Sequence, residues 1–504
     1  MSQLRCAWIA DKLKNIMAHL AAITEKGIGL AYWMQAALDL SEKVAANFAS
    51  DPVHDLRTAL RRCRSLADGI RVFDPDPGWK KMRRSGKLLF SSLGELRDIH
   101  VMREWVERLA PSGDTSGKAL DAFLAAQEEK AKAAAAIALE HFDRKQWRFW
   151  ASELPRRSAR IPVDSPLLAH LALERWQEAY ELHRQALRNR SQVAFHRLRI
   201  GLKRFRYTLE NFLPGWYGRW GEDLKKLQDL LGDVHDLDVL WQTAVRMKVF
   251  PDASSRKHWR GRIIEERRER LDSYRGKMVG KQSLWPVWRS SLPPADQLRS
   301  LALERLQVWA SFLDPRISHA EHVAQLASQL FDGLPPEGIL RPPKREIFRD
   351  ILCAAAYLHD VGRSKTNKGH HKASARLIRK MGPPLGWSSD EMYTAAAVAR
   401  YHRGALPRET HSRFAALPAV KQRVVELLGG ILRLACACDW QHDNQIRRIS
   451  VEAPDPVLRI RAEGYSEYTA LAEHLAGARH LLELACHRPV FILPANGGSE
   501  IHVA

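Results

Sequence analysis

Cysteine is scarce in this chain of 504 residues, because only six cysteines occur and none forms a CxxC pair. Zinc ribbons and dithiol redox motifs depend on such pairs, so the sequence argues against both and favours a reducing compartment, the cytoplasm. No apolar run approaches the roughly 18 residues that cross a membrane. Asp11, Lys12 and Lys14 also interrupt the apolar N-terminus. We therefore expect neither a membrane span nor a signal peptide.

Acidic residues are also in deficit. The chain has 79 lysines and arginines but 58 aspartates and glutamates, which gives a formal net charge of +21. This excess favours an acidic partner, and on its own leaves nucleic acid, polyphosphate and an anionic membrane surface open. The proportions of hydrophobic (45%) and charged (27%) residues are those of an ordinary globular protein. A single hydrophobic core stops growing near roughly 250 to 300 residues, so two or more domains are expected.

Runs that alternate β-branched and polar residues are few, whereas Ala, Leu, Glu, Lys and Gln dominate long segments. These residues favour helices. We predict an all-α protein in which a duplicated helical bundle is followed by a second helical domain. A short β-hairpin is possible at RRISVEAPDPVLRIRAEG. The proline-bearing run WPVWRSSLPPAD marks the main boundary, and the predicted parts are an N-terminal extension (1–29), a first domain (30–285) and a second domain (298–504).

An internal repeat occupies the first half of the chain. VHDLRTALRRCRSL and FHRLRIGLKRFRYTL share a histidine, an arginine three residues later, and basic residues seven, eight and ten residues later. Each copy is followed by a second related run, LGELRDIHV or LGDVHDLDV. Two signals that recur in the same order at nearly the same separation indicate a duplicated helical unit.

Each repeat places its cations along one side of a helix. Positions 0, 3, 7 and 10 of the pattern fall within an arc of roughly 80° at about 100° per residue. The apolar residues, such as Leu56 and Leu198, lie on the opposite side. Each helix can therefore bury one stripe and present a cationic one, and two copies in the same register would form facing walls of one groove. Arginine suits phosphate oxygens because its planar fork donates two parallel hydrogen bonds.

Two other interpretations of these cations remain open. The arginines could be solvated or paired with the protein's own carboxylates, or they could bind nucleic acid. The repeats have no recognisable zinc-finger, RNP-type or helix-turn-helix signature, and they lack interleaved aromatic residues that stack on bases. Contact with phosphates without base recognition favours a polyanion that has no bases.

The runs VHDLRTALRRCRS, FHRLRIGLKRFRYTLENF and LKKLQDLLGDVHDLDV resemble the CHAD family, the conserved-histidine α-helical domains. The resemblance covers roughly residues 30–285 and implies two pseudo-symmetric bundles, about 45–110 and 190–250, around a basic pore. It also implies binding of inorganic polyphosphate and possible association with polyphosphate granules. Carried onto this chain, the polyphosphate-binding residues are His54, Arg57, Arg61, Arg64, Lys87, His196, Arg199, Lys203, Arg206 and Lys225.

In the second half, histidine and aspartate occur inside apolar runs. His359 and Asp360 end a helix of Ala and Leu, where two polar groups are costly to bury without strong partners. His319 and Asp439 lie in similar runs. Imidazole nitrogen and carboxylate oxygen are ligands for Mn, Mg, Fe or Zn. A divalent metal site is one explanation, and ordinary core or surface histidines are the other.

The order His, His-Asp, Asp resembles the HD-domain phosphohydrolases. LHDVG, ARYHRGALP and ILRLACACDWQHD are similar to the C-terminal HD-like domain of the Ppx/GppA exopolyphosphatase family, over roughly residues 300–480. The resemblance implies metal ligands at His319, His359, Asp360 and Asp439, and catalytic roles for Asp360 and Arg403. It places His371 and His402 nearby, and it lets three further cations offer charge to a phosphate, Lys365, Lys368 and Lys372.

Two functions follow from these expectations. The first is an enzyme in which a polyphosphate-binding domain is joined to a metal-dependent phosphohydrolase. The second is a non-catalytic sensor of polyphosphate or nucleotides, favoured because this sequence shows no counterpart of the ATPase-fold domain that hydrolyses polyphosphate in full-length Ppx/GppA proteins. A nucleic-acid-associated protein is a weaker third alternative, with specific nucleic-acid binding not expected.

Overall fold

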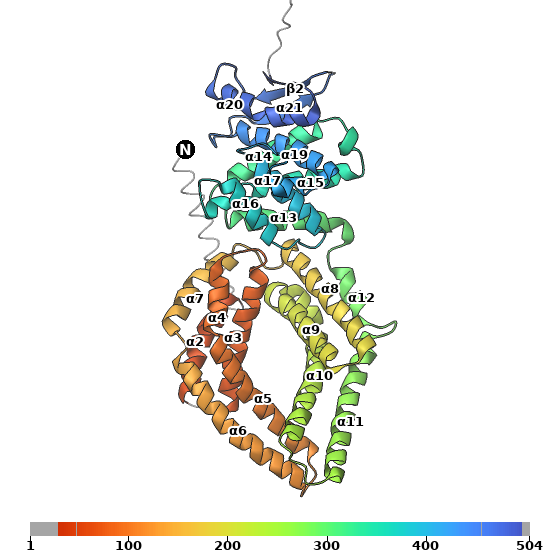
Figure 1. Ribbon diagram of the computed structural model, residues 1–504. Coiled ribbons are helices and arrows are strands. Elements are labelled where there is room, and N and C mark those ends of the chain that lie inside the picture. Colours follow the sequence, from red (N-terminus) through yellow and green to blue (C-terminus); the bar gives the residue numbers. More distant parts are fainter. Residues whose placement is uncertain (1–28, 47, 455, 496–504) are drawn as a thin grey trace, which may run out of the picture. The chain divides into compact units, whose positions relative to one another are not determined.

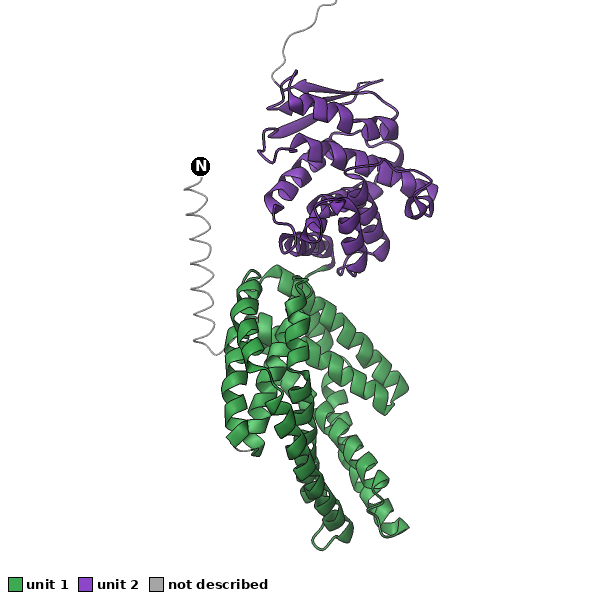
Figure 2. Ribbon diagram, turned by 60° about the vertical axis from the view of Figure 1, so that its left-hand side comes forward, with its two compact units in different colours: residues 1–294 green, residues 295–504 purple. Residues whose placement is uncertain are grey.

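The computed structural model describes residues 29–46, 48–454 and 456–495, so the predicted N-terminal extension (1–29) lies almost wholly outside the described residues. The chain divides into two compact units, residues 1–294 and 295–504 (Figure 2). Both are mostly helical, and the described residues add only a small sheet near the C-terminus. This confirms the predicted all-α class with a short β element. Within the described part of the chain, no helix has the length and apolarity that crossing a membrane would require.

The first unit contains long helices joined by short connections. They are α2 (Leu30–Ala46), α3 (Ser50–Ile70), α4 (Pro77–Ser85), α5 (Lys87–Leu109), α6 (Thr115–Glu140), α7 (Arg144–Ser158), α8 (Pro166–Asn189), α9 (Gln192–Phe212), α10 (Pro214–Arg246), α11 (Ala253–Met278) and α12 (Leu284–Ser291). The two copies of the first repeat run form α3 and α9, and the copies of the second run lie in α5 and α10. In Figure 1 these four helices lie on the inner side of the unit, with α3 and α5 opposite α9 and α10.

The apolar stripes of α3 and α9 form the core of this unit. Leu56, Leu60, Leu198, Leu202 and Phe205 are each at most 1% exposed. Their spacing of three to four residues keeps them on one side of each helix, as the sequence pattern predicts. The cationic side of each helix is therefore turned away from this packing.

The first unit continues beyond residue 285, because α12 packs onto it. Trp285 and Trp288 are almost fully buried. Their rings lie 6.0 Å from the ring of Trp176 in α8 and 5.6 Å from the ring of Phe205 in α9. Residue 285, the predicted end of the first domain, thus falls inside a helix whose tryptophans fill this core.

The second unit is a helical core with one sheet. Its elements are η1 (Ala295–Gln297), α13 (Leu298–Ser311), α14 (Ile317–Asp332), η2 (Gly338–Leu340), α15 (Lys344–Leu358), η3 (Val361–Ser364), α16 (His370–Lys380), α17 (Ser389–Tyr401), α18 (Ser412–Ala415), α19 (Ala419–Cys438), β1 (Arg448–Glu452), β2 (Leu458–Glu463), α20 (Ala470–Ala478), α21 (His480–Cys486) and β3 (Val490–Pro494). Helices α14, α15, α17 and α19 pack on one another around fully buried side chains such as Val323 and Leu432.

The sheet has the order β1-β2-β3. Strands β1 and β2 are antiparallel, with Val451 opposite Ile460, and form the predicted hairpin. Strand β3 pairs in parallel with β2, with Ile492 opposite Ile460. The sequence did not predict β3, because a parallel partner comes from a distant part of the chain and leaves no turn signal.

Candidate metal centre and polyanion-binding surface

A tight turn after α15 places the adjacent His359 and Asp360. The Gly362 amide donates a hydrogen bond of 2.8 Å to Ser374 Oγ, and that hydroxyl donates one of 2.6 Å to the His359 carbonyl. A β-carbon on Gly362 would lie 2.2 Å from the His370 carbonyl oxygen, so only glycine fits. The turn therefore locks the start of α16 against the end of α15.

Three imidazoles converge on one oxygen of Asp360. The Nε2 atoms of His359, His370 and His402 lie 3.8, 3.1 and 3.9 Å from Asp360 Oδ1. In each ring, Nδ1 bonds to a backbone carbonyl three residues earlier, at 2.6, 3.0 and 2.7 Å, respectively Ala356, Asn367 and Ala399. A carbonyl oxygen can only accept, so Nδ1 donates and, in the neutral ring, Nε2 keeps its lone pair toward Asp360.

The protonation states of Asp360 and its neighbouring histidines depend on one another. Burial disfavours an ionised carboxylate, but His359, His370 and His402 outweigh it and hold the pKa of Asp360 well below its usual range. Burial likewise disfavours an imidazolium, but Asp360 raises the pKa of His359 to about 10. Burial and the neighbouring His359 lower the pKa of His402 well below its usual value. The cluster is thus stabilised by placing positive charge beside Asp360.

His319 and Asp439 form a second group next to the first. His319 Nδ1 lies 2.6 Å from Asp439 Oδ2, and the Asn444 amide donates a hydrogen bond of 2.9 Å to Asp439 Oδ1. The ring centroid of His319 lies 5.4 Å from that of His359 and 4.1 Å from that of His442. Asp439 therefore orients His319 in this structure.

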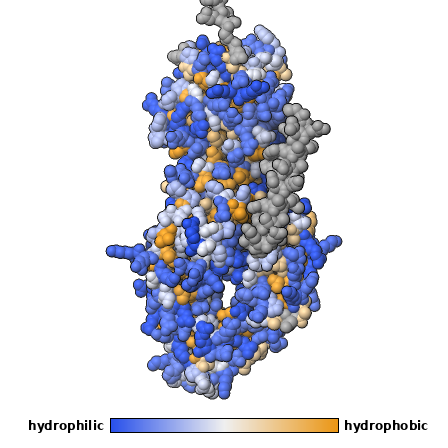
Figure 3. All heavy atoms as spheres, turned by 180° about the vertical axis from the view of Figure 1, so that it is seen from behind, coloured by the Kyte–Doolittle hydropathy of each residue, from blue (hydrophilic) through white to orange (hydrophobic). Residues whose placement is uncertain are grey.

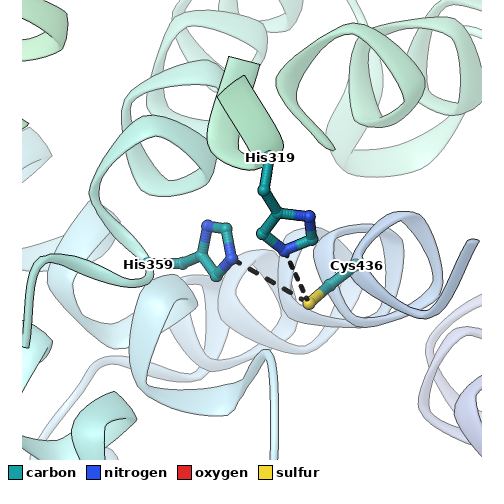
Figure 4. Close-up of side chains that lie close together, drawn as sticks. All are labelled: His319, His359 and Cys436. Atoms are coloured by element: carbon teal, nitrogen blue, oxygen red, sulfur yellow. Dashed lines mark hydrogen bonds between the residues drawn. The ribbon is translucent and has the colours of Figure 1, made fainter. Parts of the chain in front are cut away.

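Cys436 on α19 joins the two groups. Its Sγ lies 3.9 Å from Nε2 of His319 and 3.9 Å from Nε2 of His359, and both imidazoles point toward it (Figure 4). Burial opposes ionisation, but these two histidines lower the pKa of the Cys436 thiol to about 6. A thiolate at this position is a soft metal ligand.

The donor set fits a divalent metal ion. Ligand atoms lie within 4.8 Å of one another in three groups, namely His319–His359–Cys436, His319–Asp439–His442 and His359–Asp360–His402. Asp360 Oδ1 and His370 Nε2 are buried without a hydrogen bond of good geometry. Buried polar atoms are rarely left unpaired, so these two atoms are suited to a cation.

This cluster opens onto a cavity of about 320 Å³. His319, Asp360 and His402 line it from one side. Positive charge is supplied by three arginines of its wall, Arg363, Arg403 and Arg433. Arg403, the predicted catalytic cation, is exposed and lines this cavity, whereas Lys365 and Lys368 are exposed residues outside the cavity lining.

The sequence motifs predict part of this arrangement. The predicted ligands His319, His359, Asp360 and Asp439 lie in two adjacent pairs, and His402 completes the group around Asp360. The motifs place His371 near the site, but the neighbouring His370 is the residue that faces Asp360. The motifs do not single out Cys436 or His442. The run GHHKAS contains His370 and the run ACACDWQHD contains Cys436 and His442, but helix phase alone does not show which neighbour points inward.

In the first unit, the two cationic stripes face each other. The Arg61 guanidinium from α3 lies 5.5 Å from the ring centroid of Tyr207 in α9, and Lys203 Nζ from α9 lies 5.8 Å from the same centroid. Figure 3 shows an opening in the first unit, with mostly hydrophilic side chains around it. The repeats thus meet through their basic sides as the duplication predicts.

Cations crowd together at this meeting point. Burial and the charges of Arg199, Arg61 and Arg57 lower the pKa of Lys203 to about 7. Burial and neighbouring cations also lower the pKa of Arg61. The second repeat runs place acidic residues beside these cations, and burial raises the pKa of one of them, Asp236, to about 6.

Ion pairs account for only some of the predicted binding residues. Glu210 pairs with Arg62 and, at 3.3 Å, with Arg206, which is 8% exposed. Arg57 lies 3.9 Å from Asp98. Among the described residues, no ion pair reaches Arg61, Arg64, Arg199 or Lys203.

The remaining predicted residues lie around this region in the same unit. His54, Lys87 and Lys225 are exposed. His196 is half-buried, and its Nδ1 lies 3.3 Å from Nδ1 of His235, a residue that the sequence analysis did not single out. Burial and Arg199 lower the pKa of both histidines, that of His235 to about 4. Both shifts favour the neutral form of the pair.

Comparison with protein families agrees with this division. Residues 33–245 match the CHAD domain, and residues 305–468 match Ppx/GppA phosphatase, domain III. The chain joins a CHAD domain to a Ppx/GppA domain III. The CHAD match contains α3, α5, α9 and most of α10, which carry the repeated runs. The domain III match contains the whole His/Asp/Cys cluster.

A curated relative matches part of the chain. It is the guanosine-5'-triphosphate,3'-diphosphate pyrophosphatase of Pseudoalteromonas translucida (strain TAC 125), which is 28% identical over 145 residues. The match covers 29% of this chain and 27% of that protein. The chain therefore spans about a quarter of the length of this relative.

Proposed function

We propose that the protein binds inorganic polyphosphate through its CHAD domain and acts as a metal-dependent phosphohydrolase, of the HD type, through its second unit. The facing basic stripes of α3 and α9 support the proposed binding of polyphosphate. Three cations without ion pairs, Arg61, Arg199 and Lys203, are brought together from two helices, and their mutual repulsion is relieved when a polyanion binds. A linear phosphate chain supplies the regularly spaced oxygens that arginines recognise. Association with polyphosphate granules would follow from the same contacts.

The convergence of three imidazole Nε2 atoms on Asp360 carries the enzymatic part. A divalent metal such as Mn, Mg, Fe or Zn would be held by His359, Asp360, His370 and His402, with His319, Cys436 and Asp439 as the adjoining ligands. When bound, the metal would supply a Lewis acid that polarises a phosphoryl oxygen and lowers the pKa of bound water. Asp360 would orient that water, and Arg403 would hold a phosphoryl group in the cavity.

A polyphosphate or nucleotide sensor is the second candidate. Arg363 forms an ion pair with Asp360 Oδ2. A guanidinium in that position neutralises the carboxylate without a metal and would support a binding cavity without turnover. The two candidates share the cavity and differ in whether it holds a metal and releases phosphate.

The stripe is tested by charge reversal. Arg57→Glu with Arg199→Glu should abolish binding of long-chain polyphosphate, measured by fluorescence anisotropy, and should leave helical circular dichroism intact because both side chains lie off the apolar stripe. The matched control is Arg188→Glu with Arg190→Glu, which reverses the same charge on exposed arginines of the same unit. Unchanged affinity in the stripe variant would refute this binding surface.

Metal analysis separates enzyme from sensor. The purified full chain should retain about one divalent metal per molecule, and His359→Ala or Asp360→Asn should remove it. His480→Ala, which changes an exposed histidine of the same unit, should retain it. Phosphate release from polyphosphate and from guanosine nucleotides should be lost with the metal and return with added Mn. Failure to bind any metal would reject the enzyme, and bound metal without turnover would favour the sensor.

A further inference from the structure

A second cavity of the C-terminal unit has five cations and no acidic residue in its lining. It has a volume of about 440 Å³ and lies along α16, α17 and α18. No lining residue is shared with the metal-site cavity. Its charged side chains are all basic, namely Lys372, Arg376, Arg379, Arg400 and Arg413.

These cations have no acidic partners. No ion pair or hydrogen bond to a carboxylate involves any of the five among the described residues, although other surface arginines of the unit, such as Arg349 and Arg461, are paired in this way. Nη1 of Arg400 is buried without a hydrogen-bond partner. Burial and the charges of Arg413, Arg376 and Arg400 lower the pKa of Arg379. Uncompensated charge of one sign in a concave site is unfavourable until an anion enters it.

The aromatic residues of the lining indicate what kind of anion fits. The Tyr401 ring is stacked on His411 with centroids 5.7 Å apart, and Phe414 lies 5.8 Å away on its edge. The Tyr401 hydroxyl also lies 3.0 Å from His411 Nδ1. Tyr401 and Phe414 are buried. These two buried rings pack within the unit and offer no open face on which a base could stack, and the charged groups left for recognition are guanidinium and ammonium groups.

We propose that this cavity is a second anion site that binds a linear chain of at least three condensed phosphoryl groups. The inference rests on the proposed function, because it gives the second unit its own contact with the phosphate chain, apart from the CHAD stripe. Helices α16 and α17 lie side by side (Figure 1). They carry Lys372 and Arg400 into this cavity, whereas His370 at the start of α16 and His402 just after α17 line the metal-site cavity. A phosphate chain held here would lie beside the metal site on the same two helices.

Hydrogen–deuterium exchange of the full chain tests the site directly. Inorganic tripolyphosphate should slow exchange in peptides that cover α16 and residues 411–415, and orthophosphate at equal concentration should do so far less. Arg376→Gln with Arg379→Gln should raise the tripolyphosphate concentration for half-maximal protection by about 10-fold or more, because each arginine provides charge-assisted hydrogen bonds. Arg447→Gln with Arg448→Gln, which removes the same charge from exposed residues at β1, should leave it unchanged.

Thermal unfolding without any ligand provides a second test. Without phosphate, the double variant Arg376→Gln with Arg379→Gln should melt at the same or a higher temperature than the parent chain, because it relieves repulsion among unpaired cations. A comparison with guanosine 5'-triphosphate shows which kind of ligand provides the bound phosphate chain. If tripolyphosphate binds more tightly, the ligand is free condensed phosphate, and if the nucleotide binds more tightly, the ligand is a nucleoside triphosphate.

The proposal is overturned if tripolyphosphate gives no protection at α16, if orthophosphate protects equally, or if the double variant binds as the parent does. Such a result together with long-chain binding that depends on Arg57 and Arg199 would reject this cavity and leave the CHAD assignment intact. If long-chain binding does not depend on Arg57 and Arg199 but tripolyphosphate still protects α16, the CHAD assignment is rejected and this cavity is supported.

Discussion

At the scale of single residues, Lys203 shows how crowding of cations prepares a surface for an anion. Burial and four arginines lower its pKa to about 7, far below the ordinary value of a lysine. Its folded-state pKa thus lies below its unfolded-state pKa, so the unfolded chain binds more protons between these values. This residue therefore makes the folded state more stable as pH rises above 7, and less stable as pH falls toward 7.

The same shift predicts a proton uptake on binding. A bound polyphosphate favours the charged form of Lys203, so binding at pH 8 should take up close to one proton, and affinity should fall by up to about tenfold per pH unit above 7. Calorimetry in buffers of different ionisation enthalpy measures this uptake. Lys203→Arg should abolish it, whereas Lys225→Arg, at an exposed lysine of α10, should not. Binding without proton uptake in the parent chain would contradict a role for Lys203.

At the scale of elements, helix faces were predictable and helix ends were less so. The buried positions of α3 and α9 follow from apolar spacing, and the β1–β2 hairpin follows from two alternating runs around a proline turn. The selection of His370 over His371 depends on where α16 starts, which Gly362 and Ser374 fix through contacts between separate segments. In the sequence, Cys436 resembles the other small apolar residues of its run. Only the packing of α14, α15 and α19 places it between two histidines.

The turn between α15 and α16 gives a test of this dependence. Gly362→Ala places a β-carbon about where the His370 carbonyl and the Ser374 amide already lie, so it should destabilise the second unit by about 3 kcal/mol and reduce metal retention. Thermal unfolding and metal analysis of the purified chain measure the two effects. Gly382→Ala is the control, because its added β-carbon meets nothing within 4 Å. Equal behaviour of the two variants would show that the turn does not position the cluster.

At the scale of the whole molecule, the excess of 21 positive charges favours binding of a polyanion. Binding of long-chain polyphosphate to the full chain should therefore weaken steeply with salt, by about 100-fold or more between 50 and 200 mM, because several phosphates are neutralised together. Anisotropy titrations across that range give the slope. Duplex DNA at equal salt should bind more weakly, and equal affinity for DNA would favour the nucleic-acid interpretation.

The hydrogen bonds from the Nδ1 atoms of His359 and His402 have a consequence for how a metal would come and go. Their acceptors, the carbonyls of Ala356 and Ala399, lie in the last turns of α15 and α17, where a helix leaves carbonyls without an amide partner. Each histidine thus completes its own helix end whether or not its other nitrogen is coordinated. We expect a chelator to remove the metal while the helices stay folded, so that the metal can exchange and the fold does not depend on it.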